Sequence, residues 1–341
     1  MAQKSDVKAT AFKVIQYILL LLAGIGLCWM FFRNVNFAEL NQRISTGNFS
    51  WFFIVMLVSL AVYVIRTLRW QMLIRAMGHE TKFYNAFAAL SISYFVSFII
   101  PRLGEVTRCL SVKKQHNIPF MKLLGTVIVE RIADVISLIF MLLLTLVLQF
   151  GKIMEFMRVY VFRPFYEGIV LKVIHGNMLL KLIAGLIVVL MIVCFIYFRK
   201  RLRDRSPQLI DKFVSGLKDG LLSVMKLENK GLFILYTFLI WLGYYLMTWF
   251  WFFIFPETSV LTWGACLSIV TIGTIGRSVP IQGGGMGAYH FLVTNVVILY
   301  GLSASWGQTL STLIHLGQTF FTCVMGLTGL LIFFLVYWKR K

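Results

Sequence analysis

The chain alternates between long apolar runs and shorter polar segments, the pattern of a protein that crosses a membrane several times. Six runs are long enough to span a hydrocarbon core about 30 Å thick at about 1.5 Å of helical rise per residue. They cover residues 12–32, 50–65, 123–149, 179–198, 232–255 and 306–338. The first run follows a lysine-rich start, as a signal peptide would, but it is long enough to be a retained helix. We therefore expect an all-α polytopic membrane protein with about six full transmembrane helices.

Two further stretches are apolar at both ends and interrupted in the middle. Residues 83–117 are broken by the segment PRLGE that begins at Pro101, and residues 259–300 by the segment PIQGGGMG that begins at Pro280. Proline removes a helical donor and glycine loosens the backbone, so both breaks should be turns. We expect two re-entrant helical hairpins, each returning to the side on which it starts. An arrangement in which each stretch crosses the membrane twice competes with this one, because hydropathy does not separate the two.

The two broken stretches enter from opposite sides in this topology, and one long helix follows each of them. Such opposed copies indicate an inverted-topology repeat with its binding site near the bilayer midplane. The whole chain, residues 1–341, is then a single transmembrane domain. Its first repeat covers about 50–149 and its second about 232–338.

Composition and charge support a membrane protein and suggest its orientation. Hydrophobic residues make up 59% of the chain and charged residues 13%, against about 45–50% and about 25% in soluble domains. The 33 Lys and Arg residues exceed the 13 acidic ones. In the re-entrant topology 22 basic residues share one side with both termini and seven lie on the other. The positive-inside rule then predicts a cytoplasmic membrane location with both termini in the cytoplasm.

The basic loop 199–230 has nine of these residues, and attraction to anionic lipid explains it best. A nucleic-acid partner would need a folded soluble domain, which about thirty residues between spans do not make. The five cysteines are scattered through apolar runs, so we expect neither a disulfide framework nor a metal site.

Four arginines remain at membrane depth: Arg102, Arg108, Arg131 and Arg277. An isolated charge there costs about 3 kcal/mol on insertion scales, so each must pair or line a wet cavity. Arg102, Glu105 and Arg108 lie three apart and share a helical face. The simplest interpretation is a salt bridge of Glu105 with Arg102 or Arg108.

Residues Glu130, Arg131 and Asp134 lie in the first half of the run 123–149. About eight apolar residues precede Glu130, a rise of about 12 Å. That depth favours burial against the first broken stretch, although a solvated helix end would show the same pattern.

Arg277 is followed by Gly283, Gly284 and Gly285 and then by His290. Successive N–H groups of such a turn at a helix start form an anion nest, whereas the glycines alone could serve only a tight turn. Gln318 shares a helical face with His315. The simpler interpretation of His315 is that of a packing residue. No phosphate-loop ending, nucleophile elbow or metal-ligand spacing is present, so no cofactor is expected.

Three segments together carry a family resemblance: residues 100–108 (IPRLGEVTR), 129–134 (VERIAD) and 280–287 (PIQGGGMG). They resemble the transmembrane domain of lysylphosphatidylglycerol synthases, which also occurs alone in YbhN-like and AglD-like membrane proteins and is called the flippase-like domain. The resemblance covers nearly the whole chain. Two departures are that Pro101 adjoins Arg102 directly and that His290 stands near a position where the family often has an acid.

The resemblance implies a lipid-handling membrane protein. The chain ends at Lys341 without the soluble aminoacyltransferase domain of the two-domain synthases, so enzyme activity is not expected. The leading hypothesis is a translocator that moves an anionic or phosphate-bearing lipid, with other contacts to membrane lipids. Its expected substrate-binding residues are Arg102, Glu105, Arg108, Glu130, Arg131, Asp134, Arg277, Gly283, Gly284, Gly285, His290 and Gln318.

Two alternatives stay open. The first is a membrane-embedded transferase acting on lipid headgroups, with Glu130 and Asp134 as its candidate carboxylates. The second is a non-transporting subunit that anchors a separate lipid-modifying enzyme. The sequence does not indicate the oligomeric state.

Overall fold

The computed structural model describes residues 42–43, 45–116, 118–163, 166–167, 225–279 and 281–338. The predicted spans 12–32 and 179–198 lie outside the described residues, as does most of the basic loop 199–230.

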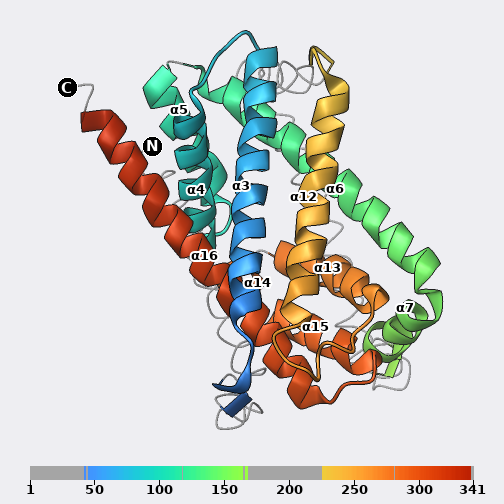
Figure 1. The fold of residues 1–341 in the computed structure, drawn as a ribbon. Helices are drawn as coiled ribbons and strands as arrows, with labels where there is room; N and C mark the ends of the chain where they lie inside the picture. Colours follow the sequence, from blue (N-terminus) through green and yellow to red (C-terminus); the bar gives the residue numbers. More distant parts are fainter. Residues whose placement is uncertain are drawn as a thin grey trace, which may run out of the picture.

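Within these ranges the chain is helical and has no strand. Each half contributes a long helix, a pair of shorter helices and a second long helix (Figure 1). The helices are α3 (Ser50–Ala76), α4 (Phe83–Ile99), α5 (Leu103–His116), α6 (Phe120–Leu148), α7 (Phe150–Met157), the π-helix η1 (Arg158–Phe162), α12 (Lys230–Phe252), α13 (Trp263–Ser278), α14 (Gln282–Gly285), α15 (Ala288–Leu299) and α16 (Ala304–Trp338).

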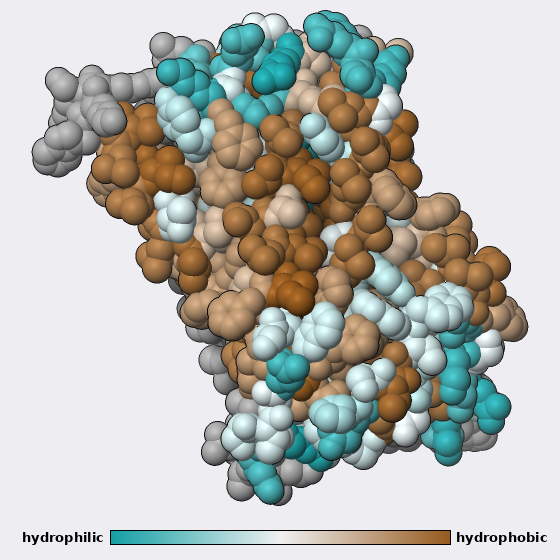
Figure 2. Space-filling view, in the orientation of Figure 1, coloured by the Kyte–Doolittle hydropathy of each residue, from teal (hydrophilic) through white to brown (hydrophobic). Residues whose placement is uncertain are grey.

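Four described helices, α3, α6, α12 and α16, are long and apolar enough to cross a membrane. They confirm the four predicted spans that fall within the described residues. Figure 2 shows the matching surface, with an apolar belt between two hydrophilic ends. The chain is therefore a multi-pass membrane protein, and which end faces the cytoplasm stays a prediction.

One predicted boundary is wrong. The first of these spans was expected to end at residue 65 and to be followed by a cytoplasmic segment 66–82, but α3 continues to Ala76. Arg66 and Arg69 were therefore counted among the 22 basic residues of the cytoplasmic side, whereas their side chains are buried inside the helical core. The helix can continue because Asp134 of α6 pairs with both guanidinium groups.

Both broken stretches are helical hairpins. The first consists of α4 and α5, joined by a turn in which Arg102 has a left-handed φ of 68°. The second consists of α13 and α15, joined by a turn that contains the short helix α14 and the left-handed Gly283, Gly284 and Gly285. The turns lie where proline and glycine predicted them. That each hairpin is re-entrant stays a prediction.

The two halves are arranged as opposed copies. Helices α3 and α12 pack side by side and run in opposite directions (Figure 1). The two hairpins lie toward opposite ends of the molecule in the same view. Helix α16 packs along α4, and α6 packs against α13, so the last helix of each half covers the hairpin of the other. The inverted-topology repeat itself stays a prediction.

Small residues allow the close approach of these helices, as is common in membrane proteins. A Cβ on Gly326 of α16 would lie 2.4 Å from Cβ of Phe95 in α4. A Cβ on Gly104 of α5 would lie within van der Waals overlap of the carbonyl oxygen of Ser93 in α4. The first hairpin therefore closes only because residue 104 has no side chain.

We predict that Gly104→Ala destabilises the protein by about 2 kcal/mol or more, because the added methyl group meets backbone that cannot move aside. Thermal unfolding in detergent measures the change. Gly151→Ala is the matched control, since no atom lies within 4 Å of a Cβ added there. Equal unfolding midpoints for the two variants would contradict the close contact.

Candidate functional site

The turns of the two hairpins meet in a cavity of about 470 Å³. Pro101 and Arg102 line it from the first turn, and Ile281 and Gly284 line it from the second. A Cβ on Gly284 would lie 3.9 Å from the ring of Phe98, so the two turns are in contact range. The fold therefore brings the two irregular turns to one place.

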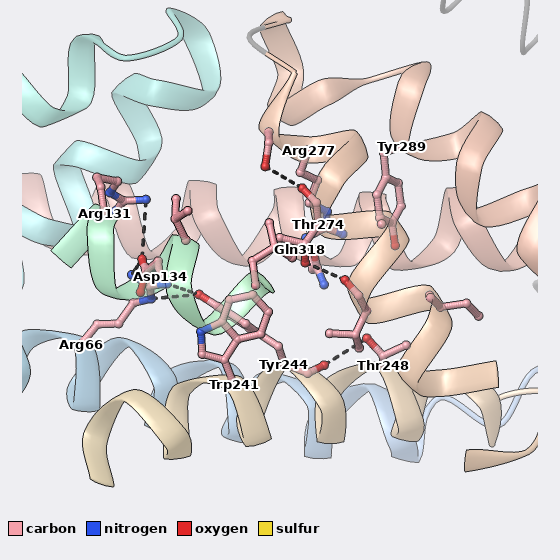
Figure 3. Close-up of a pocket in the computed structure, with 16 residues that line it drawn as sticks. Arg66, Arg131, Asp134, Trp241, Tyr244, Thr248, Thr274, Arg277, Tyr289 and Gln318 are labelled. Carbon is pink, nitrogen blue, oxygen red and sulfur yellow. Dashed lines mark hydrogen bonds and ion pairs between the residues drawn. The ribbon is translucent and has the colours of Figure 1, made fainter. Parts of the chain in front are cut away.

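A second cavity of about 420 Å³ adjoins the first and lies between α3, α6, α12, α13, α15 and α16 (Figure 3). The two cavities share a wall of polar side chains, so they are treated together as the central cavity. The shared residues are Arg66, Arg131, Tyr244, Arg277, Ser278 and Gln318.

Asp134 is the only carboxylate among the described residues that line the central cavity, and three arginines surround it. Its oxygens lie 3.3 Å from Nη1 of Arg66, 2.8 Å from Nη2 of Arg69 and 3.8 Å from Nη1 of Arg131. Arg66 also donates through Nε to the hydroxyl of Tyr244 at 2.9 Å. Figure 3 shows Asp134 between Arg66 and Arg131, with Arg277 and Tyr289 on the opposite wall.

The central cavity carries excess positive charge. Four guanidinium groups line it, those of Arg66, Arg102, Arg131 and Arg277, against the one carboxylate of Asp134. Arg131 is further neutralised by Glu105 at 3.4 Å. In the described part of the chain, Arg102 and Arg277 have no carboxylate partner, and Arg277 instead stacks 4.2 Å above the ring of Tyr289. These two groups carry the positive charge of the cavity that no described carboxylate offsets.

A second ion-pair cluster lies beside the central cavity without lining it. Arg108 Nη2 lies 2.6 Å from Glu130 Oε2, and Arg69 Nε lies 3.7 Å from Glu130 Oε1. The guanidinium of Arg108 also covers the ring of Trp70 at 3.7 Å. Glu130 and Arg69 are 0% exposed and Arg108 is 2% exposed. This cluster joins α3, α5 and α6 and acts as a structural brace.

The predicted pairing of Glu105 with Arg102 or Arg108 is wrong. Glu105 pairs with Arg131, while Arg108 turns to Glu130. The reason is that α6 packs against α5 and offers partners that the spacing within α5 could not reveal. The burial of Glu130 against the first broken stretch is confirmed, and a solvated helix end is excluded for it.

The glycines serve mainly the turn of the second hairpin. The amide of Gly285 donates to the carbonyl of Ile281, and a Cβ at Gly285 would lie 2.6 Å from the carbonyl oxygen of Gly276. Gly284 reaches the central cavity, whereas Gly283 and Gly285 do not line it. The glycines were expected to serve either a tight turn or an anion nest. The tight turn is observed directly, and of the three glycines only Gly284 lines the central cavity, where a nest could contact an anion.

His290 also lies away from the central cavity. It is 2% exposed, and its Nδ1 accepts from the amide of Gly287 at 3.3 Å. Its ring lies 4.7 Å from that of His315. Both histidines therefore pack behind the turn, while Gln318, on the same helix as His315, lines both parts of the central cavity.

The residues of the site that were missed from the sequence include Arg66, Arg69 and Tyr244. The two arginines were read as loop residues because the apolar run stops at residue 65. The sequence did contain a signal that the helix continues: Trp70, Leu73 and Ile74, which are buried in the structure, continue the helical spacing of apolar residues beyond the run.

The described residues contain no group of three His, Cys, Asp or Glu side chains placed to hold a metal ion. Glu130 and Asp134, the two carboxylates on which a transferase would depend, are both engaged by arginines.

Comparison with known proteins identifies the family. The model of the lysylphosphatidylglycerol synthase TM region matches residues 15–326, which include both hairpins and the central cavity. The chain belongs to the lysylphosphatidylglycerol synthase transmembrane family. The predicted resemblance is thus confirmed.

Similarity to a curated protein is more limited. The chain is 26% identical over 138 residues to the UPF0104 membrane protein MJ1595 of Methanocaldococcus jannaschii. That match covers 39% of this chain and 38% of the relative, so the chain spans well under half of the curated protein it matches. No solved structure matches the chain significantly.

We predict that Glu130→Gln lowers the free energy of unfolding by about 3–5 kcal/mol, because it leaves the buried Arg108 without a counter-charge. Chemical denaturation in detergent micelles measures the loss. In the exposed pair of Arg163 and Glu167, at 2.9 Å, the matched change Glu167→Gln should cost about 0–1 kcal/mol. Similar costs for the two substitutions would show that the cluster is not a brace.

Proposed function

We propose that this protein is a lipid translocator that moves an anionic, phosphate-bearing lipid between the two leaflets of the cytoplasmic membrane. The observation that carries the proposal is the central cavity, where Arg102 and Arg277 lack carboxylate partners within the described residues. A net positive cavity among membrane-spanning helices is costly unless an anion neutralises it. A lipid headgroup is the anion that the surrounding bilayer supplies.

The chemistry of the lining suits a phosphate group. A guanidinium presents a planar fork of donors that matches two phosphate oxygens at once. Arg102 comes from the first hairpin and Arg277 from the second, so one phosphate held by both would link the two halves of the repeat. The hydroxyl of Tyr94, which has no hydrogen-bond partner in the described structure, adds a further donor.

Asp134 limits how strongly the site holds its ligand. It already neutralises Arg66 and shares Arg131 with Glu105, so these two arginines attract an incoming phosphate less than Arg102 and Arg277 do. A transporter must bind its cargo and also release it. A cavity with two arginines that lack a described carboxylate partner and two that are compensated by carboxylates meets both needs.

The opposed hairpins supply a means of alternating access. Each hairpin carries one of the two unpaired arginines and lies toward a different end of the molecule (Figure 1). Movement of one hairpin against the long helices would open the cavity toward one leaflet while the other stays closed. No catalytic step is assigned, and a separate lipid-modifying enzyme is a possible supplier of the cargo.

We predict that Arg277→Gln and Arg102→Gln each slow the crossing of labelled phosphatidylglycerol at least about tenfold, the effect of losing one charge-assisted contact. The assay follows lipid sidedness in vesicles that contain the purified protein.

Arg163→Gln is the matched control, because Arg163 is exposed, pairs with Glu167 and lines neither part of the central cavity. It should leave the rate at the wild-type value. Crossing that is equally fast with wild type, with all three variants and in empty vesicles would eliminate the proposal. Co-purification of a stoichiometric soluble enzyme together with such a result would favour the anchoring subunit.

A further inference from the structure

A third cavity opens beside the central one and differs from it in character. It measures about 660 Å³ and lies between α6 and α12, with one end against α13. Its walls are almost entirely apolar, and they include Ile136, Phe140, Ile234 and Phe238, each of which is more than half exposed. We call it the α6–α12 groove.

The few hydroxyl groups of the groove are engaged in hydrogen bonds within the protein. Ser137 donates to the carbonyl of Ala133, and Thr237 donates to the carbonyl of Phe233 while accepting from Arg69. Tyr245, the remaining hydroxyl in its lining, donates to the carbonyl of Trp263, so each hydroxyl group of the groove already has an acceptor. Both of its main helices are long and apolar enough to span the membrane, so the groove faces the acyl-chain region of the bilayer.

Trp241 lines both the central cavity and the α6–α12 groove. Its side chain is 7% exposed, and its indole Nε1 is buried without a hydrogen-bond partner among the described residues. A buried indole N–H normally has a partner, so this donor is available to a bound molecule. Figure 3 shows Trp241 beside Tyr244, on the same side of the central cavity as Arg66.

The same division is visible along α6. Asp134, Val135 and Leu138 line the central cavity, whereas Ile136 and Ser137 line the groove. One helix thus presents a charged site on one side and an apolar site on the other. A molecule that fills both must itself be amphiphilic.

We propose that the α6–α12 groove binds an acyl chain of the lipid whose phosphate lies in the central cavity, with Trp241 at the boundary donating its N–H to an ester or phosphate oxygen. This inference rests on the proposed function for the position of the headgroup. It adds a second site, a chain-binding surface, and a specificity residue.

The groove contributes position rather than affinity. An acyl chain is already in hydrocarbon before it binds, so transfer to another apolar surface gains little. A groove between α6 and α12 that holds the acyl chain keeps this chain in the bilayer while the headgroup leaves the membrane surface and enters the central cavity. The lipid then passes the protein at its side, and the central cavity needs room only for the headgroup.

The test uses vesicles that contain the protein and phosphatidylglycerol with a diazirine in the middle of one acyl chain. After irradiation, mass spectrometry locates the labelled peptides, and the crossing rate is measured on the same samples. In wild type we expect label on groove-facing residues of α6 and α12. Ser137→Phe, which fills the groove, should reduce both this label and the crossing rate about tenfold.

Thr328→Phe is the matched control. Thr328 lies on the exposed side of α16, and like Ser137 it donates to the carbonyl four residues earlier in a membrane-spanning helix. Label and rate should both stay at wild-type values. Ala133→Phe replaces Ser137→Phe if the latter unfolds, and Trp241→Phe, which keeps the ring and removes the donor, should weaken lipid binding about fivefold.

The outcomes separate the inference from the proposed function. If Ser137→Phe shows wild-type labelling and wild-type crossing rates while Arg277→Gln still slows crossing, the groove does not bind the acyl chain. The proposal that the protein is a translocator would then still stand. Groove labelling that Ser137→Phe removes, with no protein-dependent crossing at all, would support the chain site and overturn transport.

Discussion

Charge that cannot stay alone in hydrocarbon is the constraint on which this structure depends. Arg69, Arg108 and Glu130 are buried at the level of the membrane-spanning helices, Asp134 is partly buried beside them, and each lies within ion-pair distance of at least one other. Because a lone charge at that depth is so unfavourable, the positions of α3, α5 and α6 relative to one another are determined by the need to bring these groups together. The brace is thus the reason that the first hairpin has a defined place.

The charge of the central cavity depends on the same ion-pair network. Asp134 belongs to both, since it pairs with the buried Arg69 and with the cavity-lining Arg66. The second half of the chain brings one arginine, Arg277, and no acid to the described cavity wall. Arg102 of the first half and Arg277 of the second, neither paired with a carboxylate among the described residues, give the cavity its excess positive charge.

Much of this arrangement could be predicted from the sequence, for physical reasons. Long apolar runs must be helices in a membrane, and the Pro101 and Pro280 breaks must be turns, so the helical class, four spans and both hairpins followed from local patterns. The ion pairs did not, because they join helices far apart in the chain. Glu105 has basic neighbours three residues away on either side, yet its partner Arg131 is on another helix. Arg66 and Arg69 were assigned to a loop because a hydropathy scale gives an arginine the same polar value whether it is exposed or buried in an ion pair.

The crosswise packing of the halves has a consequence for how the protein is made. Helix α4 is complete once residue 99 has been synthesised, but α16, which covers it, begins at residue 304. During the intervening synthesis the face of the first hairpin that α16 will occupy is open to lipid or to the insertion machinery. Assembly therefore cannot proceed helix by helix in chain order. The tertiary packing of the first half stays incomplete in the bilayer until α16 has been inserted and packs against both halves.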